Sequence, residues 1–507
     1  MENYSPTIFN QRVTERIDAL YQSGEILPIF SQRTPQTRTS AYGREMAEIK
    51  RLLERWTADD SFRLAIERDP AGAARSLGLS IDAPSLSALW SDRAALWEPI
   101  EKQPLAYFRY RAFILEKHAM REDMRAPAEN ADQRYTLWRQ RQMRRAASQL
   151  SPVQNNSIVH APFCIELTQG CSVGCWFCGI SAPKLGDLFL HTPENQTLYG
   201  GVVDALKEVF ADGTGKGFNY WATDPIDNPD YEKFMVDFHD RTNVFPQTTT
   251  ALALKDIERT RRLLQLSQEK GGLCDRFSLL TLKQLLKVHQ AFTPEELLYV
   301  EMVLQNKENT SAKVNAGRAG DERKERKSTP GQAGNELRGG TIACVSGFLI
   351  NMVNRSVKLI SPCEADERWP LGYIVFDEAT FADAGEFRSA IQRMLDTHMT
   401  PTLRLDAPVS FFDYLEYKER HDGFELRSSS QEVQFHSHPA FVAIGSLLGT
   451  NDRKSLPRTV EQVLDTLSER DEIDPAAAIH ALTLLHESGM LDTTPRRPAA
   501  ELFQVRR

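Results

Sequence analysis

Three cysteines fall in one short run of the chain and constrain its fold more than any other feature. Cys171, Cys175 and Cys178 lie in the run CSVGCWFC, directly after a predicted strand from Phe163 to Leu167. A C-x3-C-x2-C loop can present three thiolates to one four-iron cluster, because thiolates are the usual protein ligands of iron–sulfur clusters. The fourth iron then has no protein ligand and can bind a small molecule. The fold must hold this loop at the carboxyl end of a strand.

A structural zinc site is the alternative for these thiols. Zinc needs a fourth Cys or His at ligand spacing, usually from a second C-x2-C or an H-x3-H pair. The flanks, TQG before and GISAP after, contain neither. The spacing therefore favours an iron–sulfur cluster.

The composition is ordinary for a globular enzyme of about three domains. Of the 507 residues, 41 % are hydrophobic and 26 % are charged, and the formal net charge of −8 gives no reason to expect nucleic acid binding. The longest apolar runs are far shorter than the roughly 18 residues of a membrane-spanning helix, and MENYSPTIFNQRVTER lacks an apolar export segment. Seven cysteines, an odd number, indicate a reducing compartment. We expect a cytoplasmic protein without a membrane partner.

The first part of the chain, residues 1–155, has a helical pattern and predicts an all-α domain. Asp69 is a candidate N-cap, Pro70 suits the first helical position, and Gly78 follows the last turn. The basic run WRQRQMRR, which contains Arg139 and Arg145, is interpreted as a solvated helix face. A peptide- or nucleic-acid-binding patch is the alternative for this run.

Residues 156–395 alternate short apolar runs with amphipathic stretches, which predicts β-α units and a parallel sheet. Thr192 and Pro193 begin a helix after the cysteine loop, and FNYWA is a second predicted strand. This order places a site at the carboxyl ends of the strands. Within this part, residues 305–340 lack an apolar period and are rich in charge and glycine, which indicates a flexible insertion or a segment that orders over a partner.

Residues 396–507 form a third predicted domain of short strands and three helices, which start near Pro439, Thr459 and Asp474. Thr459 and Gln462 form a possible capping box. This order resembles the small winged-helix-like domains that bind leader segments of ribosomal peptide precursors. A DNA-reading winged helix is the alternative, but the last helix, DPAAAIHALTLLHESG, has no Arg or Lys to contact phosphate.

The cysteine run resembles the motif of the radical S-adenosylmethionine (SAM) enzymes, in which the amino and carboxylate groups of SAM chelate the open iron. The resemblance implies an α/β fold with a partial (β/α)6 barrel, one 4Fe-4S cluster and bound SAM. It places Phe177 against the adenine. It also places WATDPIDNPDY, which contains Ala222, Thr223 and Asp224, where that family binds the amino group of SAM through a glycine-rich motif.

The departure from glycine leaves only the acceptor role for Thr223 and Asp224, which the protons of an amino group require. Ser278 and Asn354 are further candidates to hold the ribose or carboxylate of SAM, because both are polar residues at predicted strand ends. A turn or strand-end hydrogen bond is the alternative for each.

Four cysteines lie outside the cluster run. Cys164 and Cys344 are expected to be buried structural thiols, and Cys274 a loop thiol. Cys363 follows the strand-like SVKLISP and is expected at the mouth of the barrel. Together, ELTQGCSVGCWFCG, YWATDPIDNPDY and ISPCEADERWPLGY resemble the radical SAM peptide epimerases of the proteusin (polytheonamide-type) group over about residues 156–380.

That resemblance implies that a 5′-deoxyadenosyl radical removes the α-hydrogen of an L-residue in a precursor peptide. Cys363, as a neutral thiol, then returns hydrogen from the opposite face, whereas nucleophilic cysteines act as thiolates. A turn thiol is the alternative for Cys363. The implied partners are a ribosomal precursor peptide, whose leader binds the carboxyl-terminal domain, and a reducing donor such as flavodoxin or ferredoxin.

Two other functions compete with epimerisation. One is another radical SAM peptide maturase that crosslinks, dehydrogenates or methylates its substrate. The other is a non-catalytic iron–sulfur or zinc protein that binds a peptide or DNA.

Overall fold

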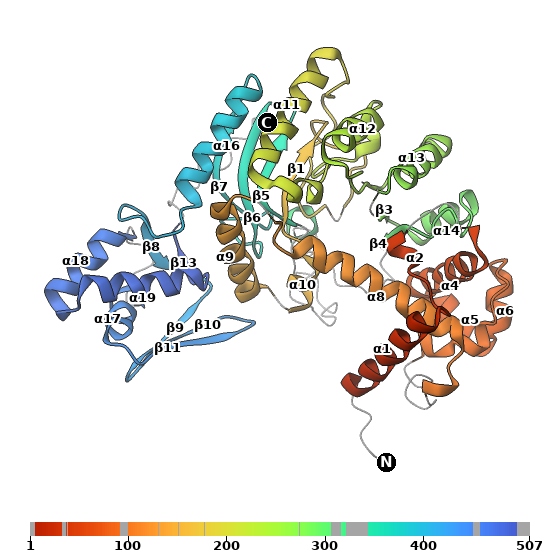
Figure 1. The fold of residues 1–507 in the computed structure, drawn as a ribbon, viewed down its shortest axis with the longest axis horizontal. Coiled ribbons are helices and arrows are strands. Elements are labelled where there is room, and N and C mark those ends of the chain that lie inside the picture. Colours follow the sequence, from red (N-terminus) through yellow and green to blue (C-terminus); the bar gives the residue numbers. More distant parts are fainter. Residues whose placement is uncertain are drawn as a thin grey trace, which may run out of the picture.

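The computed structural model shows an α/β protein in which helices before residue 160 pack against a set of small sheets (Figure 1). It describes residues 6–32, 37, 39–91, 100–129, 131–150, 152–176, 178–272, 274–305, 316–320, 343–449 and 457–493. Within these ranges, no helix is both long and apolar enough to cross a bilayer.

Before the first strand, the described residues form only helices and turns. The α-helices are α1 (Pro6–Ser23), α2 (Ile29–Gln32), α4 (Ala41–Ala58), α5 (Asp60–Arg68), α6 (Pro70–Ser76), α8 (Leu105–Arg125), α9 (Gln133–Gln149) and α10 (Pro152–Ser157), with 3₁₀ helices η1 (Ala83–Leu89) and η2 (Ile100–Lys102). The predicted start of α6 is confirmed, since the Asp69 carboxylate accepts the Gly72 N–H and Pro70 is the first helical residue. This helical part packs on the edge that β4 and α14 form, where the Arg51 guanidinium donates to the carbonyls of His289 and Phe292.

The central part holds two sheets and the helices that cover them. Its elements are β1 (Ala161–Glu166), α11 (Pro193–Phe210), η3 (Ala211–Lys216), η4 (Pro225–Asp227), α12 (Tyr231–Thr242), β2 (Thr249–Thr250), α13 (Ile257–Glu269), β3 (Asp275–Leu279), α14 (Leu282–Ala291), β4 (Val300–Leu304), β5 (Val345–Asn351), β6 (Ser356–Pro362), β7 (Tyr373–Thr380) and α16 (Ala384–His398). A large apolar core fills the space between β1, β5 and β6 and helices α11, α12 and α16.

The direction of the strands fixes which loops can meet. β2, β3 and β4 are parallel, and β1 is parallel to β5 with Ala161 opposite Val345. β6 and β7 continue the second sheet as antiparallel strands. The all-parallel sheet expected for this region is therefore wrong at β6 and β7. The expected strand FNYWA is reduced to one bridge between Phe218 and Cys164, which lies beside β1.

The last part contains two small antiparallel sheets and three helices. Its elements are β8 (Pro408–Phe411), β9 (Glu416–Arg420), β10 (Gly423–Arg427), β11 (Glu432–His436), α17 (Pro439–Gly449), β12 (Arg458–Thr459), α18 (Val460–Asp471), α19 (Pro475–Glu487) and β13 (Leu491–Asp492). The strand orders are β11-β10-β9 and β12-β8-β13. The three predicted helices are confirmed, and so is the capping box of Thr459 and Gln462 at the start of α18.

Candidate functional site

A cavity of about 340 Å³ brings most of the predicted site residues together. The three cysteines of the run CSVGCWFC line it, and so do Ala222, Thr223 and Asp224 from the loop before η4 and Ser278 from β3. These residues span more than 100 positions of the chain, from Cys171 to Ser278. The sequence therefore predicted a set of side chains that the fold gathers on one cavity.

The cysteine loop follows the carboxyl end of β1 and is held by backbone and carboxylate hydrogen bonds. The Asp227 carboxylate accepts the N–H and the hydroxyl of Ser172, at 2.8 and 2.6 Å. Gly170 has a φ of +80°, and a Cβ there would lie 2.3 Å from the Lys184 carbonyl oxygen, so only glycine fits this position. These contacts fix the backbone on both sides of Cys171.

The three thiols are half-buried and affect one another. Burial raises the pKa of Cys171, and burial together with the neighbouring Cys171 and Cys178 raises the pKa of Cys175 to about 12. The Ala182 N–H donates to the Cys178 sulfur at 3.3 Å. Among the described residues, no three Cys, His, Asp or Glu side chains stand close enough to share one metal ion. Phe177, the predicted adenine contact, lies outside the described residues.

The loop that carries Ala222 to Asp224 is tied to two strands by buried carboxylates. The Ala222 N–H donates to the Glu166 carboxylate at 2.8 Å, and Glu166 also accepts from the Asn351 amide at 2.9 Å. The Asp224 carboxylate accepts from the hydroxyl of Thr250 and the N–H of Ala251, both at 2.7 Å. The expected acceptor role of Asp224 toward a ligand therefore weakens, because protein donors already occupy its oxygens.

Arg276 is a cavity residue that the sequence analysis missed. It lies two residues before Ser278 on β3, so both side chains project from the same face of the strand. Its Nε donates to the Glu301 carboxylate at 2.9 Å, and Lys117 of α8 lies 3.3 Å from the same carboxylate. Burial alone would raise the pKa of Glu301, but these two cations lower it to about 2. The period of two in DRFSL could have identified Arg276 as a partner of Ser278.

Asn354 does not line this cavity. It lies in the exposed turn between β5 and β6, and its backbone N–H donates to the Asn351 side chain at 2.9 Å. Asn351, three residues earlier, is the amide that reaches Glu166. The sequence pattern favoured Asn354 over Asn351, because both are asparagines near a predicted strand end. Only the position of each along β5 and the turn after it shows which one reaches Glu166.

Cys363 does not line this cavity either, and its expected place at the mouth of the barrel is wrong. Because β6 runs antiparallel to β5, the carboxyl end of β6 lies beside the amino ends of β1 and β5, away from the cysteine loop. Cys363 instead lines a second cavity of about 390 Å³ with Arg145, Trp369 and Tyr414. Burial raises the pKa of the Cys363 thiol, so this thiol is neutral.

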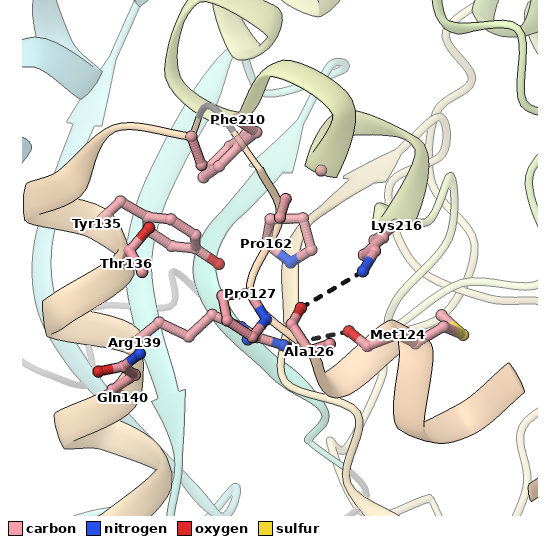
Figure 2. A pocket seen from close by; sticks show the side chains of 13 residues that line it. Met124, Ala126, Pro127, Tyr135, Thr136, Arg139, Gln140, Pro162, Phe210 and Lys216 are labelled. Carbon is pink, nitrogen blue, oxygen red and sulfur yellow. Dashed lines mark hydrogen bonds between the residues drawn. The ribbon is translucent and has the colours of Figure 1, made fainter. Parts of the chain in front are cut away.

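Arg139, Arg141 and Arg145 of the basic run on α9 are buried, so the predicted solvated face is wrong for these residues. The Arg139 guanidinium donates to the carbonyls of Met124, Arg125, Val159 and His160. Figure 2 shows this side chain beside a small pocket of about 20 Å³, where Lys216 also reaches the Ala126 carbonyl. That volume holds about one water. These two cations stabilise the end of α8 and leave no room for a ligand.

Arg318, in the described stretch 316–320 of the predicted flexible insertion, contacts the cysteine loop. Two hydrogen bonds join Arg318 to that loop. Its backbone N–H donates to the Ser181 hydroxyl and its guanidinium donates to the Ala182 carbonyl, both at 2.9 Å. The Gly317 N–H donates to the Pro370 carbonyl, in the loop that follows Cys363. Residues 306–315 and 321–340 of the predicted insertion lie outside the described residues. Residues 316–320 thus connect the loops of the two cavities.

The chain has a relative among known proteins. It is 34 % identical over 482 residues to an uncharacterized protein of Sinorhizobium fredii, y4wI, and the match covers 92 % of this chain and 91 % of the relative. At this identity and coverage, the chain belongs to the same family as y4wI. No protein-family profile matches the chain, and no solved structure matches it.

Proposed function

We propose that this member of the y4wI family is a radical SAM peptide epimerase, which converts L-residues of a ribosomally made precursor peptide to D-residues. One observation carries the proposal: the three cysteines, which follow the carboxyl end of β1, line a single cavity with Thr223, Ser278 and Arg276. Under this proposal, the central part is a partial (β/α)6 barrel.

The donor set fits a four-iron cluster better than a single ion. In such a cluster each thiolate binds a different iron, so Cys171, Cys175 and Cys178 need to face one cavity but need not converge on one point. They do face one cavity, whereas no three ligands among the described residues converge on one ion. When bound, the cluster supplies the electron that cleaves SAM and starts hydrogen abstraction.

The residues around the cysteines suit the polar groups of SAM. The Thr223 hydroxyl lines the cavity and can accept from an amino group. Arg276 presents a cation to the same cavity and suits a carboxylate, because Glu301 engages only its Nε atom. Asp224 and Glu166 act as positioning residues, since their hydrogen bonds hold the loop from Ala222 to Asp224 in place.

Inversion also requires a neutral thiol on the side of the peptide opposite the cluster. An S–H bond is weak enough to give a hydrogen atom to carbon, and burial keeps a thiol protonated. The resemblance assigns this role to Cys363, which is buried but lines the second cavity. The return of hydrogen is therefore the step for which sequence and geometry suggest different residues.

The last part of the chain is proposed to bind the leader of the precursor peptide. Its three helices and small sheets are compatible with a winged-helix-like module. Helix α19, which ends this module, carries no Arg or Lys and is therefore unsuited to contact the phosphates of DNA.

The test uses anaerobically reconstituted full-length protein with a precursor peptide in deuterium oxide. We expect bound iron and sulfide, and one added deuteron for each residue found as the D-isomer after hydrolysis. Cys175→Ala should lose cluster and inversion together, whereas Cys274→Ala, a buried thiol outside the cavity, should keep both. Bound zinc without iron would contradict the proposal. A peptide product that lost hydrogen or gained carbon would indicate a crosslinking enzyme or a methylase instead.

A further inference from the structure

The cavity of the cluster cysteines has thiols at both of its ends. The cysteine loop stands at the carboxyl end of β1, whereas Cys344 directly precedes β5. Since β5 is parallel to β1 with Val345 opposite Ala161, Cys344 lies beside the amino end of β1. The Ala161 N–H donates to the Cys344 carbonyl at 2.7 Å, which fixes that position. Cys344 and the cluster cysteines nevertheless line the same cavity.

Two thiols outside the cluster run line this cavity, and they differ in access. Cys164 lies in the middle of β1 and is 1 % exposed. Cys344 is half-buried and lines the cavity, so it is the more accessible of these two thiols. Burial raises the pKa of Cys344 to about 11, which keeps this thiol protonated at neutral pH.

An aromatic pair separates the other candidate thiol from this cavity. Tyr373 pairs in register with Pro362, the residue before Cys363. Its ring packs edge-on against Trp221, which lines the cluster cavity, with 6.0 Å between the ring centroids. Cys363 and Cys344 thus lie at the same end of the strands of this sheet. Of these two thiols, only Cys344 lines the cavity of the cluster cysteines.

The same cavity wall also contains a buried donor that a peptide could satisfy. The Trp221 indole N–H has no acceptor among the described residues. A buried donor without a partner costs free energy, and a peptide carbonyl is an acceptor of the required kind. This observation is independent of the thiols and is compatible with a ligand that carries a hydrogen-bond acceptor.

We propose that Cys344 is the thiol that returns hydrogen to the peptide α-carbon. This inference rests on the proposed function and names its second catalytic residue. The Cys344 S–H bond breaks, its hydrogen atom forms the new C–H bond, and the radical passes from carbon to sulfur. One electron from the low-potential donor that also reduces the cluster, together with one proton from water, restores the thiol. A cavity with the cluster loop at one end and Cys344 at the other supplies the two opposite faces that inversion needs.

The test compares Cys344→Ser, Cys363→Ser and Cys164→Ser in the full chain. Serine keeps the size of the side chain, but its O–H bond is too strong to give up the hydrogen atom. We expect Cys344→Ser to cleave SAM and to lose both inversion and deuterium incorporation, while the other two variants retain them. Loss of inversion in Cys363→Ser, with or without loss in Cys344→Ser, would overturn the inference.

A second measurement needs neither cluster nor turnover. In the iron-free protein, N-ethylmaleimide should modify Cys344 before Cys164, and added precursor peptide should slow the modification of Cys344. Modification of Cys344 that the peptide leaves unchanged would overturn the inference. If the wild-type protein inverts no residue, the proposed function fails, whereas inversion by Cys344→Ser overturns only the role of Cys344.

Discussion

At the scale of single residues, the arginines of α9 show how a buried cation can be used for structure. Arg145 is 2 % exposed, and its guanidinium donates to the side chains of Gln142, Gln149 and Ser361 and to the Pro362 carbonyl. Burial lowers the pKa of Arg145, and this effect outweighs the opposite effect of the neighbouring Tyr414 and Cys363 side chains. Hydrogen bonds to neutral acceptors therefore replace the solvent that this cation loses.

We expect Arg145→Ala to destabilise the protein by about 3 kcal/mol, because several buried acceptors would lose their donor and a cavity would form. Arg144→Ala is the matched control, since Arg144 is an exposed neighbour with one hydrogen bond to the Glu487 carbonyl. Its cost should be about 0.5 kcal/mol. Urea unfolding followed by circular dichroism measures both variants, and equal costs would contradict this role of Arg145.

The residues of the site could be predicted where spacing along the chain reports chemistry. The cysteine run, Thr223 and Ser278 were predicted as site residues, and all of them line one cavity. Arg276 and Cys344 were missed as site residues. An arginine within a strand, or a cysteine just before a strand, is as easily explained by a structural role as by a role in a site. Only the register of distant strands places them on the cavity.

At the scale of helices and strands, local signals predicted starts well and strand directions poorly. The Thr192 hydroxyl caps α11 and Pro193 begins it, as expected. Nothing in SVKLISP indicates whether the strand runs parallel or antiparallel, because burial on both faces gives the same apolar pattern. For this reason the sequence placed Cys363 at the wrong end of the sheet's strands. Because β6 is antiparallel to β5, its carboxyl end, where Cys363 follows, lies at the opposite end from the cysteine loop.

The capping box of α18 allows a test at this scale. Thr459→Ala removes the hydroxyl that accepts the Gln462 N–H, so the first turn of α18 should open about fivefold more often, which corresponds to about 1 kcal/mol. Hydrogen exchange of the amides from Val460 to Val463 measures this opening. Thr466→Ala is the control, because that exposed hydroxyl bonds only the Gln462 carbonyl inside the same helix. Equal exchange in both variants would contradict the capping role.

At the scale of the whole molecule, α9 joins the central sheet to the last part of the chain (Figure 1). The Ser430 hydroxyl, in the turn between β10 and β11, donates to the Ala147 and Ser148 carbonyls near the end of α9. The Ser148 and Tyr414 hydroxyls are 2.7 Å apart, and Tyr414 also lines the cavity of Cys363. Under the proposed function, binding of a leader to the last part can therefore affect the Cys363 cavity through α9.

This junction should weaken in mild acid because of His486 on α19. Burial, with Arg141 of α9 nearby, lowers the pKa of His486 to about 3. The unfolded side chain titrates near 6.5, so between these values only the unfolded state takes up the proton. The stability that neutral His486 contributes is complete above pH 6.5 and is lost as the pH falls toward 3.

Between pH 7.5 and 5.5, we expect this residue alone to lower the free energy of unfolding by about 1 kcal/mol. His160 is also buried with a lowered pKa and adds to the slope in every variant. The measurement is therefore the difference between wild type and His486→Leu in urea unfolding at the two pH values. A smaller loss in His486→Leu supports the assignment, because leucine fills the site without a proton to bind. An unchanged loss would contradict a lowered pKa of His486 in the folded protein.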